Sequence, residues 1–275
     1  NVLEERDVQV RGYKIRLPLD VLLVASANPE DYTNRGRIIT PLKDRFGSQI
    51  RTHYPLDVAT EMQIVRQEAR PATIGDVQVH YPAFMEEIVA QISHLARANA
   101  NVSQRSGVSV RVSVSNHELL AANAVRRGLR AGETVVAPRV SDLEALVAST
   151  ASKIEIESVD DGREGAVFEQ ILRGAVLQVY KRRVSGDKTK ELITAFESGT
   201  VVSTGEDVSS SELFGFAQKV PELQQLALSL LDGNESPASV ASAVEFVLEG
   251  LHLAKRLNKD SAGARATYRS RTTAV

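Results

Sequence analysis

Two short motifs place a metal ligand or a nucleophile at a spacing that enzymes use, and both are incomplete. His117 and Glu118 match the start of a zinc-protease pattern, which needs a second histidine four residues after the first. Position 121 is alanine instead. Residues 107–111 (GVSVR) resemble half of the turn that exposes a nucleophilic serine in hydrolases, but Arg111 stands where that turn needs glycine. We therefore expect neither zinc-protease nor serine-hydrolase chemistry.

The residues that would complete a nucleotide or metal site are also absent from the sequence. It contains no Gly-Lys-Ser or Gly-Lys-Thr phosphate loop and no apolar strand that ends in Asp-Glu to hold Mg²⁺. It contains no cysteine, which excludes disulfides, thiolate metal sites and cysteine nucleophiles. The five histidines are scattered, so we expect no metal site. Alone, this chain is not expected to form a complete NTPase site.

One polar residue occupies a position that favours ligand binding. Residues 21–27 (VLLVASA) form an almost unbroken apolar run of strand length, which predicts a central parallel strand covered on both faces. The run stops at Asn28, which is followed by Pro29. The amide of Asn28 would then lie at the carboxyl end of a parallel strand, where ligands bind in α/β sheets.

The elements around this strand can be predicted from periodicity and turn residues. Residues 1–6 resemble the end of an amphipathic helix, and alternating apolar residues on both sides of Arg11-Gly12 predict a β-hairpin over residues 8–17. Residues 30–39 are polar and predict a surface loop. A short helix over 41–46 and a sheet-edge strand over 48–54 should follow.

The remainder of the chain has helical spacing. Helices are predicted over the ranges 57–68, 82–100, 115–129, 141–156, 163–184, 210–231 and 236–257, with caps at Asp57, Ser115 and Ser141. The tail, 258–275, is rich in Ser, Thr, Ala and Arg, and we expect it to be mobile or held by a neighbour. The fold class is therefore mostly α with a partial α/β part.

Composition limits the class of protein. The chain has 275 residues, of which 43% are hydrophobic, enough for one large or two modest domains. With 33 basic and 35 acidic residues the net charge is −2, so no overall field favours nucleic acid or an anionic membrane. No apolar run approaches the roughly 18 to 20 residues that span a bilayer, and no signal peptide is apparent. We expect a soluble cytoplasmic protein.

The motifs near Asn28 resemble those of a known family. Residues 27–36 (ANPEDYTNRG), followed by residues 41–47 (PLKDRFG), resemble the second half of an AAA+ ATPase module, in particular the magnesium-chelatase ATPase subunit and its MoxR-like relatives. The resemblance covers about 130 residues and implies the C-terminal portion of such a module, without the half that carries the phosphate loop. It implies residues 1–57 as part of the α/β subdomain, 58–157 as a helical lid and 158–275 as a helical extension.

The resemblance implies a role for several polar side chains. Asn28 matches sensor 1, which orients the attacking water, and Arg45 matches the arginine finger that reaches a neighbouring subunit. The alternative for Asn28 is that it only caps the turn before Pro29. The alternative for Arg45 is an ion pair within the chain, with Asp44 or another carboxylate. Arg111 lies where the sensor 2 arginine contacts the phosphates of bound ATP, although the family's proline is replaced by Val110. Arg37 is a second candidate for contact with nucleotide, or else only solvates its loop.

The implied function is that of a ring motor. The full-length chain would bind ATP and Mg²⁺ between the subunits of a homo-oligomeric ring, which is expected to be a hexamer. Hydrolysis would remodel a protein partner or insert a metal. This fragment alone is not expected to hydrolyse ATP. The Mg²⁺ would be held mainly by the missing half of the module. A MoxR-like chaperone for metal-dependent or von Willebrand-type proteins is an alternative, and so is a non-catalytic helical scaffold.

Nucleic acid and membrane are not expected as partners. The basic clusters Arg126-Arg127-Arg130 and Lys181-Arg182-Arg183 have helical spacing and no interleaved aromatic residues, which is more typical of a solvated helix face than of a nucleic-acid site. Arg11 and Lys14 near the tip of the predicted hairpin leave a nucleic-acid-remodelling ATPase as a third alternative.

Overall fold

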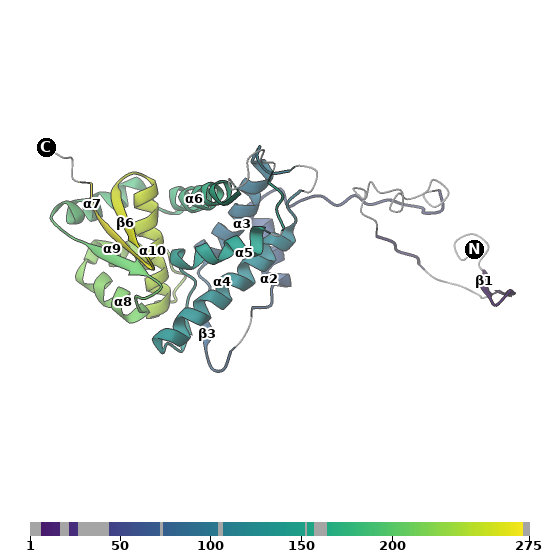
Figure 1. Ribbon diagram of the computed structural model, residues 1–275, viewed down its shortest axis with the longest axis horizontal. Coiled ribbons are helices and arrows are strands. Elements are labelled where there is room, and N and C mark those ends of the chain that lie inside the picture. The colour runs from purple at the N-terminus through teal and green to yellow at the C-terminus, as the bar shows by residue number, and fades with distance from the viewer. Residues whose placement is uncertain are drawn as a thin grey trace. The chain divides into compact units, whose positions relative to one another are not determined.

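The computed structural model describes residues 7–16, 22–26, 44–71, 74–103, 107–151, 153–156 and 164–271. The chain divides into two compact units, residues Asn1–His53 and Tyr54–Val275, and each is described by itself. The structure is mostly helical with small sheets, as the sequence predicts (Figure 1). Asn28 and Arg37 lie outside the described residues.

The predicted hairpin is confirmed in the first unit. Strands β1 (Asp7–Val10) and β2 (Tyr13–Arg16) pair in antiparallel fashion, with Val8 opposite Ile15 and Val10 opposite Tyr13. Arg11 and Gly12 connect them with φ angles of 48° and 86°, the left-handed pair of a type I′ turn. Because opposite residues share a face, the apolar side chains lie together on one side of the hairpin.

The other predicted elements of the first unit are not found where residues are described. Residues 22–26 are not in a strand and are exposed; the exposed fraction of Leu22 is 89%. Asp44 and Arg45 form a turn rather than part of a helix, and residues 48–54 form no strand. A strand is stable only when neighbours satisfy its backbone hydrogen bonds, and no described strand pairs with these segments.

The first helices of the second unit follow the predicted pattern, with one correction. Helices α2 (Val58–Glu68) and α3 (Ala83–Ala98) form as predicted, and the Asp57 carboxylate caps α2 by accepting from the Thr60 amide at 2.7 Å. That hydrogen bond lowers the pKa of Asp57. Helix α4 (Val110–Ala131) begins five residues before the predicted Ser115, because Ser109 is its N-cap.

Another predicted helix is interrupted. The segment 141–156 forms the 3₁₀ helix η1 (Val140–Ala145) and the short helix α5 (Leu146–Ala151) instead of one long helix. The Asp142 side chain accepts from the Arg139 amide at 2.8 Å and so closes a tight turn at the start. The two-residue strands β3 (Gln78–Val79) and β4 (Val135–Val136) pair in parallel beside α4.

The C-terminal half contains helices that the sequence predicts and a sheet that it does not. Helices α6 (Glu164–Arg183) and α10 (Pro237–Leu253) agree with the prediction. The predicted helix 210–231 is split into α8 (Ser210–Lys219) and α9 (Pro221–Leu228), since Pro221 cannot donate a helical hydrogen bond. Between α6 and α8 lie η2 (Gly186–Thr189), α7 (Lys190–Glu197) and β5 (Val202–Gly205).

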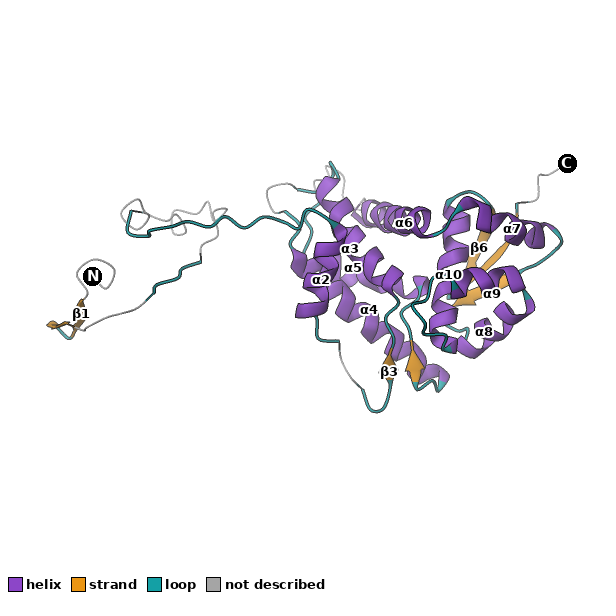
Figure 2. Ribbon diagram, turned by 180° about the vertical axis from the view of Figure 1, so that it is seen from behind, coloured by secondary structure: helices purple, strands orange, loops and turns teal. Residues whose placement is uncertain are grey.

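Of the two expectations for the tail, mobile or held by a neighbour, the first is wrong for residues 258–270. Strands β6 (Leu257–Ala262) and β7 (Arg265–Ser270) form a hairpin, and β7 also pairs with β5, which gives the order β5-β7-β6 (Figure 2). Gly263 turns the hairpin with a φ of 59°. Leu257 and Tyr268 are buried, whereas the residues between them are mostly polar and face outward, so composition alone concealed the strands.

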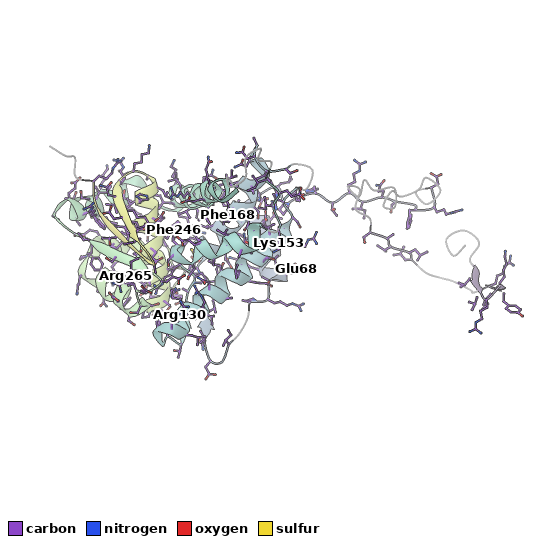
Figure 3. The ribbon with its side chains drawn as sticks, viewed as in Figure 1. Glu68, Arg130, Lys153, Phe168, Phe246 and Arg265 are labelled. Carbon is purple, nitrogen blue, oxygen red and sulfur yellow. The ribbon has the colours of Figure 1, made fainter. Side chains whose placement is uncertain are left out.

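One apolar core runs through the second unit on both sides of residue 157. Phe84 of α3 stacks on Phe246 of α10 at a centroid distance of 4.6 Å, and Tyr180 of α6 meets the same ring at 6.0 Å. Figure 3 labels Phe246 together with Phe168 of α6, which belongs to the same core. The division at residues 57 and 157 into subdomains stays a prediction.

Alanine substitutions at two helical glycines are expected to change the stability in opposite directions. A Cβ at Gly250 would lie 2.0 Å from a ring carbon of Tyr180, so Gly250→Ala should lower the free energy of unfolding by about 1–3 kcal/mol. Gly215 of α8 has open space around it, and Gly215→Ala should raise the free energy by about 0.5–1 kcal/mol. Urea unfolding of both variants measures these free energies. Equal free energies of unfolding for the two variants would contradict the close contact between Gly250 and Tyr180.

Candidate functional site

The structure describes two of the four predicted site residues, one in each unit. Arg45 lies exposed in the turn at residues 44–45 of the first unit. Arg111 lies exposed in the first turn of α4, in the second unit. The candidate site is therefore centred on Arg111.

The first turn of α4 has the features of an anion site. Its N-cap Ser109 accepts from the backbone amide of Arg111 at 3.3 Å, and the Nε of Arg111 lies 3.3 Å from the same hydroxyl oxygen. The turn contains no acidic side chain. The amides of a helix N-terminus carry partial positive charge, so the Arg111 guanidinium adds a full charge where anions are already favoured.

The loop that leads into α4 is held by an arginine from α3. Arg97 donates from Nε to the carbonyl of Val108 at 2.9 Å, and its guanidinium lies 4.8 Å from the centre of the Tyr54 ring. Gly107 has a φ of 63°, and a Cβ there would lie 2.1 Å from the Tyr54 hydroxyl. The loop is therefore pressed against Tyr54 and tied to Arg97, and this fixes where α4 begins.

Arg97 is in turn held by a buried carboxylate. Glu61 of α2 is inaccessible to solvent and accepts from Nη1 and Nη2 of Arg97 at 2.6 and 3.0 Å. It also accepts from the hydroxyl of Ser113 at 2.6 Å, within the second turn of α4. We call Glu61, Arg97 and Ser113 the α4 clamp, because they join α2, α3 and the start of α4.

Two further polar side chains surround the α4 clamp. The Ser93 and Ser113 hydroxyls are 2.6 Å apart, and because Ser113 donates to Glu61, Ser93 donates to Ser113. The Nε2 of His94 lies 3.0 Å from Glu61 Oε2 without the geometry of a hydrogen bond. Arg97 is thus the principal partner of the buried charge, in the bidentate form that arginine and carboxylate prefer.

Sequence reasoning did not identify the α4 clamp. The signal in the sequence was the spacing of Glu61, which lies four residues before Val65 and therefore on the same face of α2. These two residues are the buried residues of that helix. A carboxylate on an apolar helix face needs a charged partner. The sequence does not show that the partner comes from a helix more than thirty residues later.

Arginines of both basic clusters that the sequence contains form ion pairs with carboxylates of the chain. Arg126 binds Glu206 at 2.9 Å, and Arg182 and Arg183 both bind Glu87, at 2.8 and 2.5 Å from Nε. Arg127 is buried rather than on a solvated face and binds Asp142 at 3.1 Å. Burial alone would lower the pKa of Arg127, but the charge and hydrogen bond of Asp142, together with the charges of Glu245 and Glu133, outweigh burial and raise that pKa.

A second polar location is a cavity of about 290 Å³ beside the start of α10. His80 and Asn234 line it, and their side chains are 2.8 Å apart. Tyr81 also lines it and stacks on His117 at 4.0 Å. Burial raises the pKa of the Tyr81 hydroxyl and lowers that of His117, so both rings are neutral at pH 7. None of these residues belongs to the Arg111 site.

Neither a metal centre nor a membrane segment is found where the structure describes the chain. Across the described ranges, no group of three or more His, Asp or Glu side chains could hold a metal ion. No helix in that part of the chain is long and apolar enough to cross a membrane. Comparisons of the sequence with protein-family models and curated proteins, and of the fold with solved structures, gave no match.

The α4 clamp predicts a large loss of stability when its arginine is removed. Arg97→Met should lower the free energy of unfolding by about 3–5 kcal/mol, because it leaves the Glu61 carboxylate buried without its main partner. The control is Arg173→Met, which removes an exposed ion pair with Glu169 on α6 and should change stability by under about 0.5 kcal/mol. Urea unfolding gives both values. A small effect of Arg97→Met would show that the clamp does not hold the loop.

Proposed function

We propose that the chain is part of an AAA+ ring motor similar to the magnesium-chelatase ATPase subunit and its MoxR-like relatives. The motor would couple ATP hydrolysis to remodelling of a partner protein or to metal insertion. The observation that supports this best is Arg111, an exposed cation in the first turn of a 22-residue helix with no acidic side chain in that turn. The motifs at residues 27–36 and 41–47 supply the family assignment.

Arg111 suits the phosphates of ATP for a physical reason. Its guanidinium can donate two parallel hydrogen bonds to phosphate oxygens, and the helix amides beside it favour the same charge. The α4 clamp fixes this turn before any ligand arrives, which lowers the entropy lost on binding. Arg111 would therefore act on nucleotide bound in its own subunit, and Arg37 is a second proposed contact.

Asn28 and Arg45 are proposed for the catalytic step. The Asn28 amide would orient the attacking water, and Arg45 would neutralise charge that develops on the phosphoryl group in a neighbouring subunit. In the module that the chain resembles, Mg²⁺ would be held mainly by the phosphate-loop half. Bound there, Mg²⁺ would neutralise phosphate charge.

Chelatase and MoxR-like chaperone activity both remain within this proposal, as does a hexameric ring in the cytoplasm. A non-catalytic scaffold is the second candidate, and one observation favours it. Residues 22–26 and 48–54 do not form the sheet strands that a nucleotide-binding subdomain needs. Nucleic acid is the least supported partner, because the two basic clusters bind carboxylates of the chain itself.

The proposed role of Arg111 predicts a loss of nucleotide affinity. In the full-length protein, Arg111→Ala should weaken binding of a fluorescent ATP analogue by about 10- to 150-fold, the value of a hydrogen-bonded charge of about 1.5–3 kcal/mol. Arg111→Lys should restore part of the affinity, because it keeps the charge without the planar fork. Arg173→Ala is the matched control. Unchanged affinity in Arg111→Ala would remove Arg111 from the site.

The proposed role of Arg45 predicts a loss of turnover with little loss of binding. Arg45→Ala should lower steady-state ATP hydrolysis by the 10³ to 10⁵ that an arginine finger typically contributes. Because Arg45 would act on a neighbouring subunit, mixing Arg45→Ala with Asn28→Ala subunits should restore sites that contain both residues. Normal turnover in Arg45→Ala, or no recovery on mixing, would contradict a shared site.

A further inference from the structure

The three-stranded sheet of the C-terminal half has one buried face and one exposed face. Val202 of β5, Leu257 of β6 and Tyr268 of β7 are buried, and helices α7 and α10 contact the sheet. Successive side chains of a strand point to opposite faces. Ser203 and Arg269, each next to a buried residue in the sequence, are accordingly exposed. The second face of the sheet is therefore accessible to a partner.

The exposed face of the sheet is rich in arginine. Arg265, labelled in Figure 3, begins β7, Arg269 follows on the same side of the strand, and Arg271 is exposed directly after it. The first and last of these residues lie about 20 Å apart at the usual rise of a strand. Between them, the Thr267 hydroxyl lies 3.2 Å from that of Ser203 on β5. We call these five residues the arginine face.

The positive charge of the arginine face is only partly neutralised. Asp260 of β6 forms an ion pair with Arg269 at 2.8 Å. Arg265 and Arg271 form no ion pair with a carboxylate among the described residues, and Arg271 donates to the Lys255 carbonyl at 2.8 Å. By contrast, every arginine of helix α6 is paired with a carboxylate of the chain. The arginine face therefore keeps a positive charge that α6 does not.

The residues at the two ends of the arginine face do not remove this charge. Two exposed cations, Lys255 and Arg256, lie just before β6. At the other end, the turn after β5 carries the carboxylates Glu206 and Asp207. Glu206 is already paired with two arginines of α4, namely Arg126 and Arg130, at 2.9 and 3.8 Å. Cations thus outnumber carboxylates over the whole length of the face.

The chemistry of the arginine face favours an acidic protein segment over nucleic acid. Solubility requires only charges of mixed sign, whereas an excess of one sign attracts an anionic partner. Arginine binds carboxylates through two parallel hydrogen bonds. Tyr268 points into the core, so the described residues of this face include no aromatic ring on which bases could stack. Val201, exposed by 51% just before β5, adds an apolar contact that a peptide side chain can use.

We propose that the arginine face is the docking surface for an extended, acidic segment of a partner protein. In an extended segment, carboxylates at every second residue lie on one side and about 7 Å apart, the spacing expected between Arg269 and Arg271. Such a segment would lie along β7, with its carboxylates on the arginines and an apolar side chain on Val201. This inference does not depend on ATP binding, because none of these residues belongs to the Arg111 site.

Fluorescence anisotropy of the full-length protein with a labelled peptide of alternating glutamate and threonine, about twelve residues long, tests this at about 0.05 M salt. The test variant is Arg265→Gln with Arg271→Gln, which leaves the ion pair of Arg269 in place. It should bind the peptide about 5- to 30-fold more weakly, the effect of two exposed charge pairs. The control, Arg70→Gln with Arg173→Gln, changes the net charge equally and should bind as the unaltered protein does.

The same peptide with glutamine in place of glutamate should not bind, and urea unfolding should show that both variants fold as the unaltered protein does. No binding of the acidic peptide, equal binding of the glutamine peptide, or unchanged affinity in the test variant would overturn the proposal. An oligonucleotide of about twelve nucleotides that binds more tightly than the peptide, and loses affinity in the test variant, would assign the face to nucleic acid instead. These measurements involve no nucleotide hydrolysis, so their failure would leave the proposed ATPase function unaffected.

Discussion

Helix α10 must be enclosed on every side, and the arrangement of the second unit depends on this constraint. All residues from Ala238 to Leu251 are buried. A helix that is buried on every face has no face for solvent, so neighbours have to cover it. The cover comes from α6, α8, α9 and strand β6, and Phe84 of α3 stacks on Phe246. This is why helices from both sides of residue 157 share one core.

Charged residues within this core decide how the enclosing elements are aligned. Glu245 and Glu249 lie on α10 itself, and each is paired with groups from another segment: Glu245 with the Ser141 amide, and Glu249 with Lys259 and Tyr268 at 2.8 and 2.6 Å. The hydrophobic effect has no preferred direction, but a buried carboxylate requires donors at hydrogen-bonding positions. The hydrophobic core thus supplies most of the stability, and the buried charges supply the alignment.

The same division of labour applies at the proposed Arg111 site. The guanidinium is exposed and makes few contacts of its own, while the buried Glu61 and Arg97 fix the loop that presents it. A binding residue needs access to its ligand, so its position has to be set by neighbours that are not accessible. The site is therefore as much a property of α2 and α3 as of α4.

The sequence by itself determined the local elements: the hairpin about Arg11-Gly12, the cap at Asp57, and most of the helices, because turn chemistry and the 3.6-residue period act over a few neighbours. It also singled out Arg111. Only the tertiary structure decided what depends on distant partners. Residues 22–26 have the composition of a buried strand, but no described strand pairs with them. The residues of β6 and β7 have the composition of a polar tail, but they form strands in which Tyr268 is buried against α10. Glu61, Arg97 and the buried charges of Arg127, Arg139, Asp142 and Glu245 are not distinguished from other charged residues in the sequence. They become fixed elements of the fold only because burial makes each of them require a partner from elsewhere in the chain.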